Sequence, residues 1–285
     1  MKSPAMPDVF LANDAEHADT WDDERPLVDA IRARGLSVDR AVWDDPHVDW
    51  SSARTVVLRY AFDYIGKRDE FCDWAGRLPN VHNPARLIRW NSHKAYLREL
   101  EDAGIATVPT EWLDAGATGN LSDILDACGW TDVVVKPAID NGARGTLRVN
   151  ADDLAPGQAH LEGLLARRDV MIQPYVAATE GPGEHKLIYL DGTFSHAIRE
   201  HPRLGGVAFV MDRITRIDPE PDEIALAEQV LALIAESPLL YARVDVVMDE
   251  GIARLMELEV IEPVLFFSKA PGSAERMADA IAARI

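Results

Sequence analysis

Short apolar runs alternate with amphipathic stretches along the first part of the chain. The runs Val9–Asn13, Ser37–Trp43 and Thr55–Tyr60 are rich in β-branched and aromatic residues, which is typical of buried strands. Between and after them, Glu24–Arg34 and Arg68–Arg77 carry apolar residues at helical spacing. This alternation of strand and helix predicts a small parallel sheet of the α/β class.

The pattern changes in the rest of the chain, where strands pair with their neighbours in sequence. His185–Leu190 and Thr193–Glu200 flank an Asp-Gly turn, and Tyr241–Met248 and Arg254–Ile261 flank a turn that ends in Gly251. Short turns of this kind join antiparallel strands. Antiparallel pairs behind a parallel sheet predict an α/β part followed by an α+β part, and hence more than one domain.

Composition narrows the class of protein and its partners. The chain has 285 residues, of which 47% are hydrophobic, enough for a sizeable core. Its net charge of −19 disfavours nucleic acids and anionic membranes, which both reward basic surfaces. Cys72 and Cys128 lie far apart, and neither a signal-like start nor a long apolar run occurs. We therefore expect a reducing, cytoplasmic location and no membrane partner.

Val133–Asn150 contains the first candidate for chemistry. Its β-branched run ends near Lys136, and the turn that follows contains Gly142 and Gly145. A lysine beside a flexible glycine loop suits a nucleotide triphosphate, because the ammonium neutralises phosphate charge and glycine lets backbone N–H groups approach it. The alternative is a plain β-hairpin with an Asn-Gly turn, and the two readings are compatible.

Lysine is scarce, since only six of the 29 basic residues are lysine. Lysines at strand ends or in clefts are therefore more informative than usual, which draws attention to Lys94 and Lys186 beside Lys136. Lys94 follows Asn91-Ser92, which predicts the start of a helix that runs to Ala103.

The second antiparallel pair predicts a patch of acids. Folding this hairpin about its turn places Asp245 opposite Glu257 and Arg243 opposite Glu259, all on one face, because strand side chains alternate. Like charges directly opposite each other destabilise a strand pair, whereas three carboxylates suit Mg²⁺ or Mn²⁺. A solvated polar face with an ordinary Arg–Glu pair is the alternative. The apolar continuation after Glu259 favours the metal.

Two weaker signals concern ligand recognition. The apolar strand Met171–Val176 includes Gln173 and precedes Glu184, an order that suits an adenine edge and sugar hydroxyls; a plain core strand is the alternative. Arg59 ends a strand of the front sheet, where ligands of open sheets bind, and suits a substrate carboxylate, with Asp63 suited to an ammonium. A surface Arg–Asp pair is the alternative there.

Taken in order, these motifs resemble those of the ATP-grasp ligases, in particular the glutathione-synthetase-like group that includes D-cycloserine synthetase. The resemblance covers nearly the whole chain and rests on Trp90–Leu97, Val108–Thr110, Val134–Pro137, the glycine loop, Ile172–Tyr175, Gly183-Glu184, Arg243–Asp245 and Glu257–Glu259. It implies an ATP-grasp fold with a Rossmann-like unit at 1–91, a small central lid subdomain at 92–172 and a C-terminal antiparallel-sheet subdomain at 173–285.

The resemblance also implies cofactors and residue roles. ATP and two Mg²⁺ or Mn²⁺ ions are expected, with the ions bound by Asp245, Glu257 and Glu259. The other implied positions are Lys94 and Lys136 at the phosphates, Gly142 to Gly145 as a lid, Gln173, Tyr175 and Val176 at the adenine, Glu184 at the ribose, and Arg199 and Arg243 near the γ-phosphate and the reacting carboxylate. The chain departs from many members at Glu262-Pro263, in a loop that helps to hold the acceptor.

The implied activity is ATP-dependent ligation of a carboxylate to an amine through an acyl phosphate, with a small amino-acid-like substrate. Ring closure within one substrate, as in D-cycloserine synthesis, is a second form of this activity. A non-catalytic ATP-sensing module on the same fold is the alternative, although the chain keeps Lys94 and every metal carboxylate. A kinase acting on a hydroxyl would need a base that the sequence does not reveal. A homodimer is a further expectation.

Overall fold

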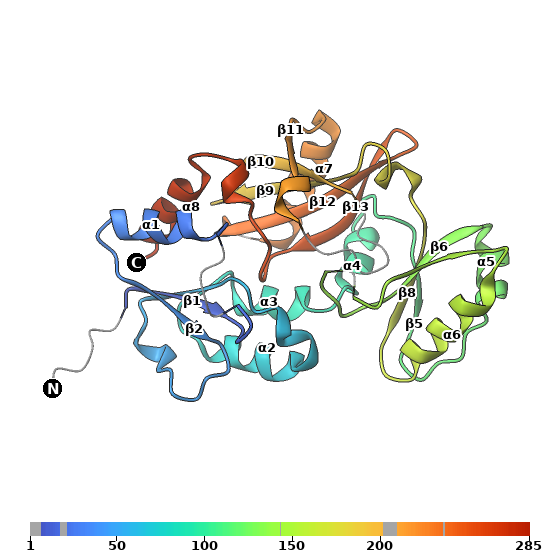
Figure 1. The fold of residues 1–285 in the computed structure, drawn as a ribbon, viewed down its shortest axis with the longest axis horizontal. Coiled ribbons are helices and arrows are strands. Elements are labelled where there is room, and N and C mark those ends of the chain that lie inside the picture. Colours follow the sequence, from blue (N-terminus) through green and yellow to red (C-terminus); the bar gives the residue numbers. More distant parts are fainter. Residues whose placement is uncertain (1–6, 18–21, 143, 202–209, 236) are drawn as a thin grey trace.

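Three sheets follow one another along the chain in the computed structural model (Figure 1). The structure describes residues 7–17, 22–142, 144–201, 210–235 and 237–285. The central sheet and its two helices form one end of the molecule, and the N-terminal and C-terminal sheets together form the rest (Figure 1). No helix of the described residues is long and apolar enough to cross a membrane.

The N-terminal sheet is parallel, as predicted. Its strands are β1 (Val9–Asn13), β2 (Val38–Val42), β3 (Thr55–Leu58) and β4 (Val81–His82), in the order β2-β1-β3-β4. The accompanying helices are α1 (Arg25–Ala33), α2 (Arg68–Arg77) and α3 (Ala85–Asn91), with the 3-10 turns η1 (Trp50–Ser52) and η2 (Phe62–Gly66). Every residue of β1 and β3 is buried, as expected for strands covered on both faces.

The central sheet is antiparallel. Its strands are β5 (Glu111–Leu113), β6 (Asp132–Pro137), β7 (Leu147–Asn150) and β8 (Val170–Pro174), in the order β5-β8-β6-β7, and α5 (Leu121–Cys128) and α6 (Leu154–Leu165) pack against it. β6 and β7 form the expected hairpin around the glycine turn. Because β8 ends at Pro174, the predicted limit between residues 172 and 173 falls within a strand, and the domain limits stay a prediction.

The C-terminal sheet is antiparallel and has the order β11-β10-β9-β12-β13. Its strands are β9 (Glu184–Leu190), β10 (Thr193–Glu200), β11 (Thr215–Ile217), β12 (Tyr241–Asp249) and β13 (Ile252–Glu259), with helices α7 (Pro221–Ile234) and α8 (Ser273–Ala282) and the short turns η3 (Ala177–Thr179), η4 (Met211–Arg213) and η5 (Phe267–Lys269). Both predicted antiparallel pairs are present.

Both faces of the C-terminal sheet are covered, which decides where its polar residues lie. On one face, Leu187 and Val244 belong to a core that α7 completes. On the other face, Ile188 and Tyr241 belong to a core shared with α1 and α8. Strand alternation then carries the charged residues of β9, β12 and β13 onto this second face, beyond the apolar contacts and toward the central sheet.

The helix predicted from Asn91 to Ala103 is two helices. α3 ends at Asn91, and α4 spans Tyr96–Asp102. In the turn between them, the backbone N–H of Lys94 donates to the carbonyl of Ala138 at 2.8 Å, just past the end of β6. Local propensity could not predict this break, because a contact with a distant strand end causes it. The break places Lys94 where the central and C-terminal sheets meet.

Candidate active site

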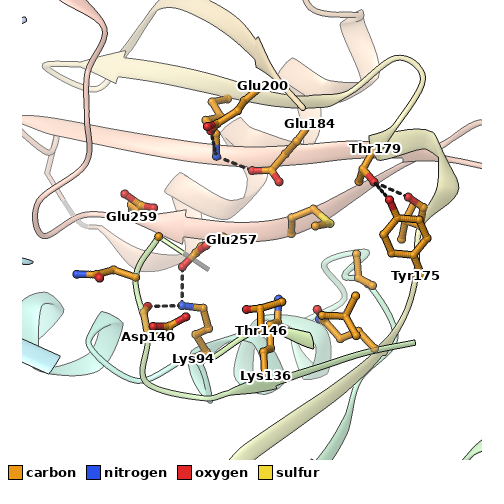
Figure 2. Close-up of a pocket in the computed structure, with 18 of the residues that line it drawn as sticks. Lys94, Lys136, Asp140, Thr146, Tyr175, Thr179, Glu184, Glu200, Glu257 and Glu259 are labelled. Atoms are coloured by element: carbon orange, nitrogen blue, oxygen red, sulfur yellow. Dashed lines mark hydrogen bonds and ion pairs between the residues drawn. The ribbon is translucent and has the colours of Figure 1, made fainter. Parts of the chain in front are cut away.

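A cleft lies between the central and C-terminal sheets (Figure 2). It is lined by most of the positions that the sequence indicated, namely Lys94, Lys136, Gly142, Gln173, Tyr175, Val176, Glu184, Arg243, Glu257 and Glu259. Asp140, Asn141, Thr146, Lys186, Glu200 and His201 also line it and were not assigned a role from the sequence. The cleft therefore gathers cations and carboxylates from four separate stretches of the chain, at 94, 136–140, 184–200 and 243–259.

The hairpin of β12 and β13 has the two predicted pairs, Asp245 with Glu257 and Arg243 with Glu259. A register shift between Asp245 and Val246 offsets the pairs nearer the turn by one residue from the symmetric hairpin that was predicted. One oxygen from each of Asp245, Glu257 and Glu259 lies within 4.8 Å of the other two. No other group of three potential metal ligands lies this close together among the described residues. Oxygen ligands this close together can share a hard divalent cation. The predicted metal-binding set is thus brought together by the fold.

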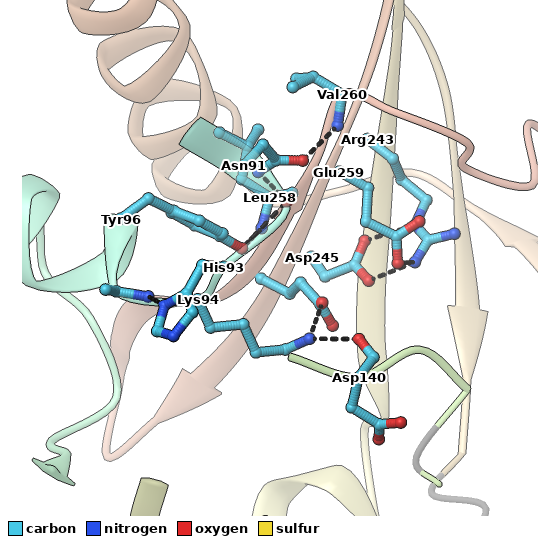
Figure 3. A network of polar contacts seen from close by, with 12 residues as sticks. Asn91, His93, Lys94, Tyr96, Asp140, Arg243, Asp245, Leu258, Glu259 and Val260 are labelled. Atoms are coloured by element: carbon cyan, nitrogen blue, oxygen red, sulfur yellow. Dashed lines mark hydrogen bonds and ion pairs between the residues drawn. The ribbon is translucent and has the colours of Figure 1, made fainter. Parts of the chain in front are cut away.

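Arg243 and Lys186 hold the deepest of these acids in its charged form. The Arg243 guanidinium binds Asp245 through Nε at 2.8 Å and Nη2 at 2.9 Å, and it also pairs with Glu259 (Figure 3). Lys186 Nζ lies 2.7 Å from Asp245 Oδ2. Burial raises the pKa of Asp245, but these two cations outweigh it and hold that pKa well below its usual range.

Glu259 behaves differently within the same cluster. Burial raises its pKa to about 7, with Glu257 and Asp245 adding to the rise and Arg243 opposing it. One carboxyl of the set is thus only partly ionised at neutral pH. A bound divalent cation would supply the missing positive charge and favour full ionisation.

The two predicted phosphate lysines lie on the opposite wall, and their partners differ. Lys94 Nζ is 2.7 Å from Glu257 Oε1 and donates to the carbonyl of Asp140 at 2.8 Å (Figures 2 and 3). Lys136 pairs with no carboxylate of the described residues, and burial lowers its pKa. Strand alternation explains its direction, because Val133 and Val135 point into the core beneath α5 and α6. The Lys136 ammonium is therefore available to bind a ligand.

The glycine loop crosses the cleft beside these lysines. Gly142 and Gly145 have φ angles of 64° and 78°, which favour glycine. Gly142 lines the cleft, whereas Gly145 packs against Pro137. Asn141 Nδ2 donates to the carbonyl of Phe62 at 2.9 Å, so the loop also touches the N-terminal unit. The lid role of Gly142 and Gly145 stays a prediction, and Ala143 lies outside the described residues.

The far end of the cleft is apolar. Val108, Val176 and Met256 line it and pack together. Gln173 Nε2 donates to Thr110 Oγ1 at 2.8 Å, and the Tyr175 ring lies 3.5 Å from the Arg148 guanidinium.

This end suits a flat aromatic base, in agreement with the position expected for adenine. The base would lie between apolar side chains, with polar groups at its edge.

Glu184 lies between the apolar end and the acids, beside a lysine that the sequence analysis noted without assigning it a role. Lys186 Nζ contacts Glu184 at 2.6 Å and Glu200 at 3.4 Å, in addition to Asp245. Burial raises the pKa of Glu184 and lowers that of Lys186, but in Lys186 the surrounding acids outweigh burial and raise the pKa. Glu184 and Lys186 are two residues apart on β9, so their side chains share one face of the sheet. This spacing is the sequence signal that could have indicated that Lys186 belongs to the site.

Arg199 does not line the cleft. On β10 the cleft is lined by Glu200, and alternation places Arg199 on the opposite face of the sheet. Its partner across the strand pair is His185, which binds Glu223 of α7 at 2.8 Å. The role of Arg199 near the γ-phosphate stays a prediction that this geometry does not support.

The two residues expected to bind substrate have other partners. Arg59 is fully buried, and its Nε lies 3.1 Å from Glu24 Oε1. Asp63 accepts from Trp43 Nε1 at 2.7 Å and pairs with Lys67 at 3.4 Å. Neither lines the cleft. Their substrate role stays a prediction that the geometry does not support.

A smaller cavity adjoins the acids. It shares Lys94, Asp140, Asn141, Glu257 and Glu259 with the cleft and is completed by Tyr64, Asn91, Ser92, Ala138, Leu258 and Glu262. Burial raises the pKa of Glu262 well above its usual range, with Glu259 adding to the rise. From the sequence, Glu262 was noted only as a departure from the family pattern. The cavity places this further buried carboxyl beside the predicted metal ligands.

Comparison with known proteins shows which of them are similar to this chain in sequence and fold. Residues 9–86 match the family described as the N-terminal domain of D-cycloserine synthetase DcsG. The chain is 31% identical over 294 residues to the cycloserine biosynthesis protein DcsG of Streptomyces lavendulae, which covers 97% of this chain and 98% of that protein. The crystal structure of D-cycloserine synthetase DcsG has a TM-score of 0.87 and 30% identity, covering 97% of this chain and 99% of that one.

The fold extends to more distant ligases. D-alanine–D-alanine ligase from Bacillus anthracis, solved with ATP, has a TM-score of 0.66 and 16% identity, covering 97% of this chain and 95% of that one. This similarity confirms the predicted ATP-grasp architecture of one parallel and two antiparallel sheets. Together with the similarity along the whole chain to DcsG, it shows that the chain belongs to the ATP-grasp ligases as a homologue of D-cycloserine synthetase.

Proposed function

We propose that this protein uses ATP and Mg²⁺ to activate the carboxylate of a small amino-acid-like substrate, and that it forms an amide by closing a ring within that substrate. One observation carries the proposal. Glu257 and Glu259 of the β12–β13 hairpin line one cleft with the cations Lys94 and Lys136, and the buried Asp245 lies close enough to both acids to share a metal ion with them. Acid-bound divalent ions opposite lysines are what a polyphosphate needs for binding and transfer.

The residues of the cleft fit this pair of cofactors. Asp245, Glu257 and Glu259 offer only oxygen ligands, which Mg²⁺ prefers. Lys136 has no acidic partner among the described residues, so a phosphate would complete its electrostatic surroundings. An ATP-grasp ligase of the same fold, PsnB, was solved with Mg and ADP. We propose two ions here, as the family resemblance implies.

In the proposed reaction, a substrate carboxylate oxygen attacks the γ-phosphorus, the bond to ADP breaks, and an acyl phosphate forms. An amine nitrogen then attacks the carbonyl carbon, loses a proton and expels inorganic phosphate. Bound Mg²⁺ would supply positive charge at the transferring phosphoryl group. Lys94 and Lys136 hold the polyphosphate, and Arg243 stays charged beside the reacting groups.

Ring closure is favoured over the joining of two molecules by the similarity to the cycloserine biosynthesis protein DcsG, which extends along almost its entire length. Joining would require a second substrate molecule beside the metal ligands.

Turnover of ATP to ADP and phosphate tests this proposal. Purified protein is incubated with Mg-ATP and a panel of D- and L-amino acids with ureido or hydroxylamine side chains, and product mass distinguishes ring closure from joining. Glu257→Gln should abolish ADP formation while the melting temperature changes little, because the variant loses a metal charge at the edge of the cleft.

Glu101→Gln, at an exposed position on α4, is the matched control and should retain wild-type turnover. ADP formation by Glu257→Gln at the wild-type rate would refute the metal role. A wild-type protein that binds Mg-ATP but turns it over with no member of the panel would instead favour a nucleotide-sensing module.

A further inference from the structure

Glu262 is a buried carboxyl with no assigned role. It lines the smaller cavity, and only 7% of its surface is exposed. It forms no ion pair with a cationic side chain in the part of the chain that the structure describes. Lys94, the cation of the same cavity, is already bound to Glu257 and to the Asp140 carbonyl. Burying a carboxylate without a partner is costly, so the site favours a positively charged ligand group.

The backbone that leads to Glu262 is held in place by side chains of other elements. Asn91 Nδ2 donates to the carbonyl of Leu258 at 2.8 Å, and its Oδ1 accepts from the N–H of Val260 at 3.0 Å (Figure 3). The Tyr241 hydroxyl donates to the carbonyl of Ile261 at 2.7 Å. These contacts fix the segment at three of its residues. Glu262 is therefore held at the cavity before a ligand binds, and binding costs little further conformational entropy of this segment.

A metal ion is not the partner that the geometry favours. The described acids that can share an ion are Asp245, Glu257 and Glu259, and Glu262 does not join them at a common ligand distance. Glu262 nevertheless shares its cavity with Glu257 and Glu259. A ligand group beside the metal site but separate from it is therefore required.

We propose that Glu262 binds the ammonium group of the substrate whose carboxylate is activated at the adjoining acids, and so selects for amino-acid-like substrates. This inference rests on the proposed function. An α-ammonium and a carboxylate are attached to one carbon, so their binding sites must be neighbours. Glu262 follows Glu259 by three residues in a cavity they share, which meets this condition. Tyr64 also lines this cavity.

The inference differs from the expectation based on the sequence, which placed the ammonium at Asp63. Asp63 is engaged by Trp43 and Lys67 and lines neither cavity. Glu262 therefore replaces it as the specificity-determining position.

Binding of a product and of its analogue without the amine tests the inference. D-Cycloserine carries an amine on its ring, and isoxazolidin-3-one is the same ring without it. Both are titrated by calorimetry into wild-type protein with Mg-ADP, at a pH where the amine is protonated. Wild-type protein should bind D-cycloserine about tenfold or more tightly than the analogue, as a charge-assisted contact would give.

Glu262→Gln should remove this preference while affinity for Mg-ADP stays as in wild type, and Glu101→Gln should keep the preference. Glu262→Asp retains the charge and should keep part of the preference. If Glu262→Gln does not fold, as its melting temperature would show, the comparison of wild type with Glu262→Asp decides instead.

Four results would overturn the inference. Two concern the preference for D-cycloserine over isoxazolidin-3-one, namely its absence in wild-type protein and its persistence at the wild-type level in Glu262→Gln. The third is that Glu262→Asp binds each ring with the same affinity as wild type. The fourth is loss of the preference in Asp63→Asn. The proposed function is judged separately by ADP formation. Ligation with an unchanged preference in Glu262→Gln would refute the role of Glu262 and leave the proposed function intact.

Discussion

The lysines of the cleft differ in what they already hold, and this difference predicts which of them responds most to a ligand. Lys94 is paired with Glu257, and Lys186 is paired with Asp245 and Glu184. Lys136 pairs with no acid of the described residues, and burial lowers its pKa. A buried ammonium without a counter-charge gains most when a phosphate arrives, because the ligand restores the missing interaction.

Lys136→Ala should therefore weaken nucleotide binding without destabilising the protein. We expect a loss of about 10- to 100-fold in affinity for Mg-ADP, which corresponds to roughly 1.4–2.8 kcal/mol. Calorimetric titration measures this change, with the melting temperature as the check on folding. Lys67→Ala removes a surface lysine that contacts Asp44 and should leave affinity unchanged. Unchanged affinity in Lys136→Ala would remove this residue from the phosphate site.

At the residue scale, the sequence predicted best where geometry is local. Asp245 and Glu257 were placed opposite each other by folding the hairpin about its turn, and the structure has that pair. The pairs nearer the turn are offset by one residue, because a bulge between Asp245 and Val246 shifts the register. The role of Arg199 near the phosphates stays a prediction that the geometry does not support. Because buried residues lie on both faces of β10, its sequence does not indicate which face meets the cleft. Glu262 was noted but not assigned, since its burial depends on distant elements.

At the element scale, α6 shows how closely the central subdomain is packed. Gly157 lies on the face of this helix that meets the sheet, where an added Cβ would come within 2.4 Å of Val149 Cγ1 and 2.9 Å of Leu121 Cδ2. Gly163 lies on the same helix with open space around its Cα. The two glycines therefore separate the effect of packing from the effect of helix propensity.

Gly157→Ala should destabilise the protein by about 1–3 kcal/mol, because the strain of overpacking exceeds the gain in helix propensity. Gly163→Ala should instead stabilise it by up to about 1 kcal/mol, since only propensity acts there. Urea unfolding of the two variants measures both changes. Equal stabilisation by the two substitutions would mean that α6 does not approach β7 as closely as described.

The break between α3 and α4 shows what a helical pattern cannot reveal. Residues 91–103 have helical character throughout, yet the N–H of Lys94 bonds to Ala138 and Tyr96 begins a new helix. The hydroxyl of Tyr96 in turn donates to the carbonyl of Leu258 on β13. Contacts with two other sheets therefore override local propensity. They also bring Lys94 to the acids, where it pairs with Glu257, so the missed break shapes the candidate site.

At the scale of the whole molecule, the three units are joined unequally. Asn83 binds the carbonyls of Tyr241 and Val260 at 2.8 and 2.9 Å, which ties the N-terminal unit to the C-terminal sheet. At the junction with the central unit, the Asp140 carbonyl holds Lys94 and the neighbouring Asn141 holds Phe62. Asp140 thus lies where all three units meet, and its ionisation state bears on the stability of the assembly.

Asp140 binds its proton more tightly in the folded protein than in the unfolded chain. Burial raises its pKa from 3.8 to about 7, with Glu257 adding to the rise and Lys94 opposing it. Between these two values the folded state carries more protons than the unfolded state. The free energy of unfolding therefore falls as pH rises through this interval, by at most about 1.4 kcal/mol per pH unit for one group, and levels off above it.

Asp140→Asn cannot ionise, so it should lack this contribution. The free energy of unfolding of wild type minus that of the variant should fall between pH 4 and about 7 and then stay constant. Urea unfolding of both proteins at intervals of one pH unit measures the difference, in which groups common to both cancel, including the buried His196 with its lowered pKa. Asp102→Asn, at an exposed position on α4, is the matched control. A difference that rises with pH would mean that Asp140 is charged where the units meet, and that Lys94 outweighs its burial.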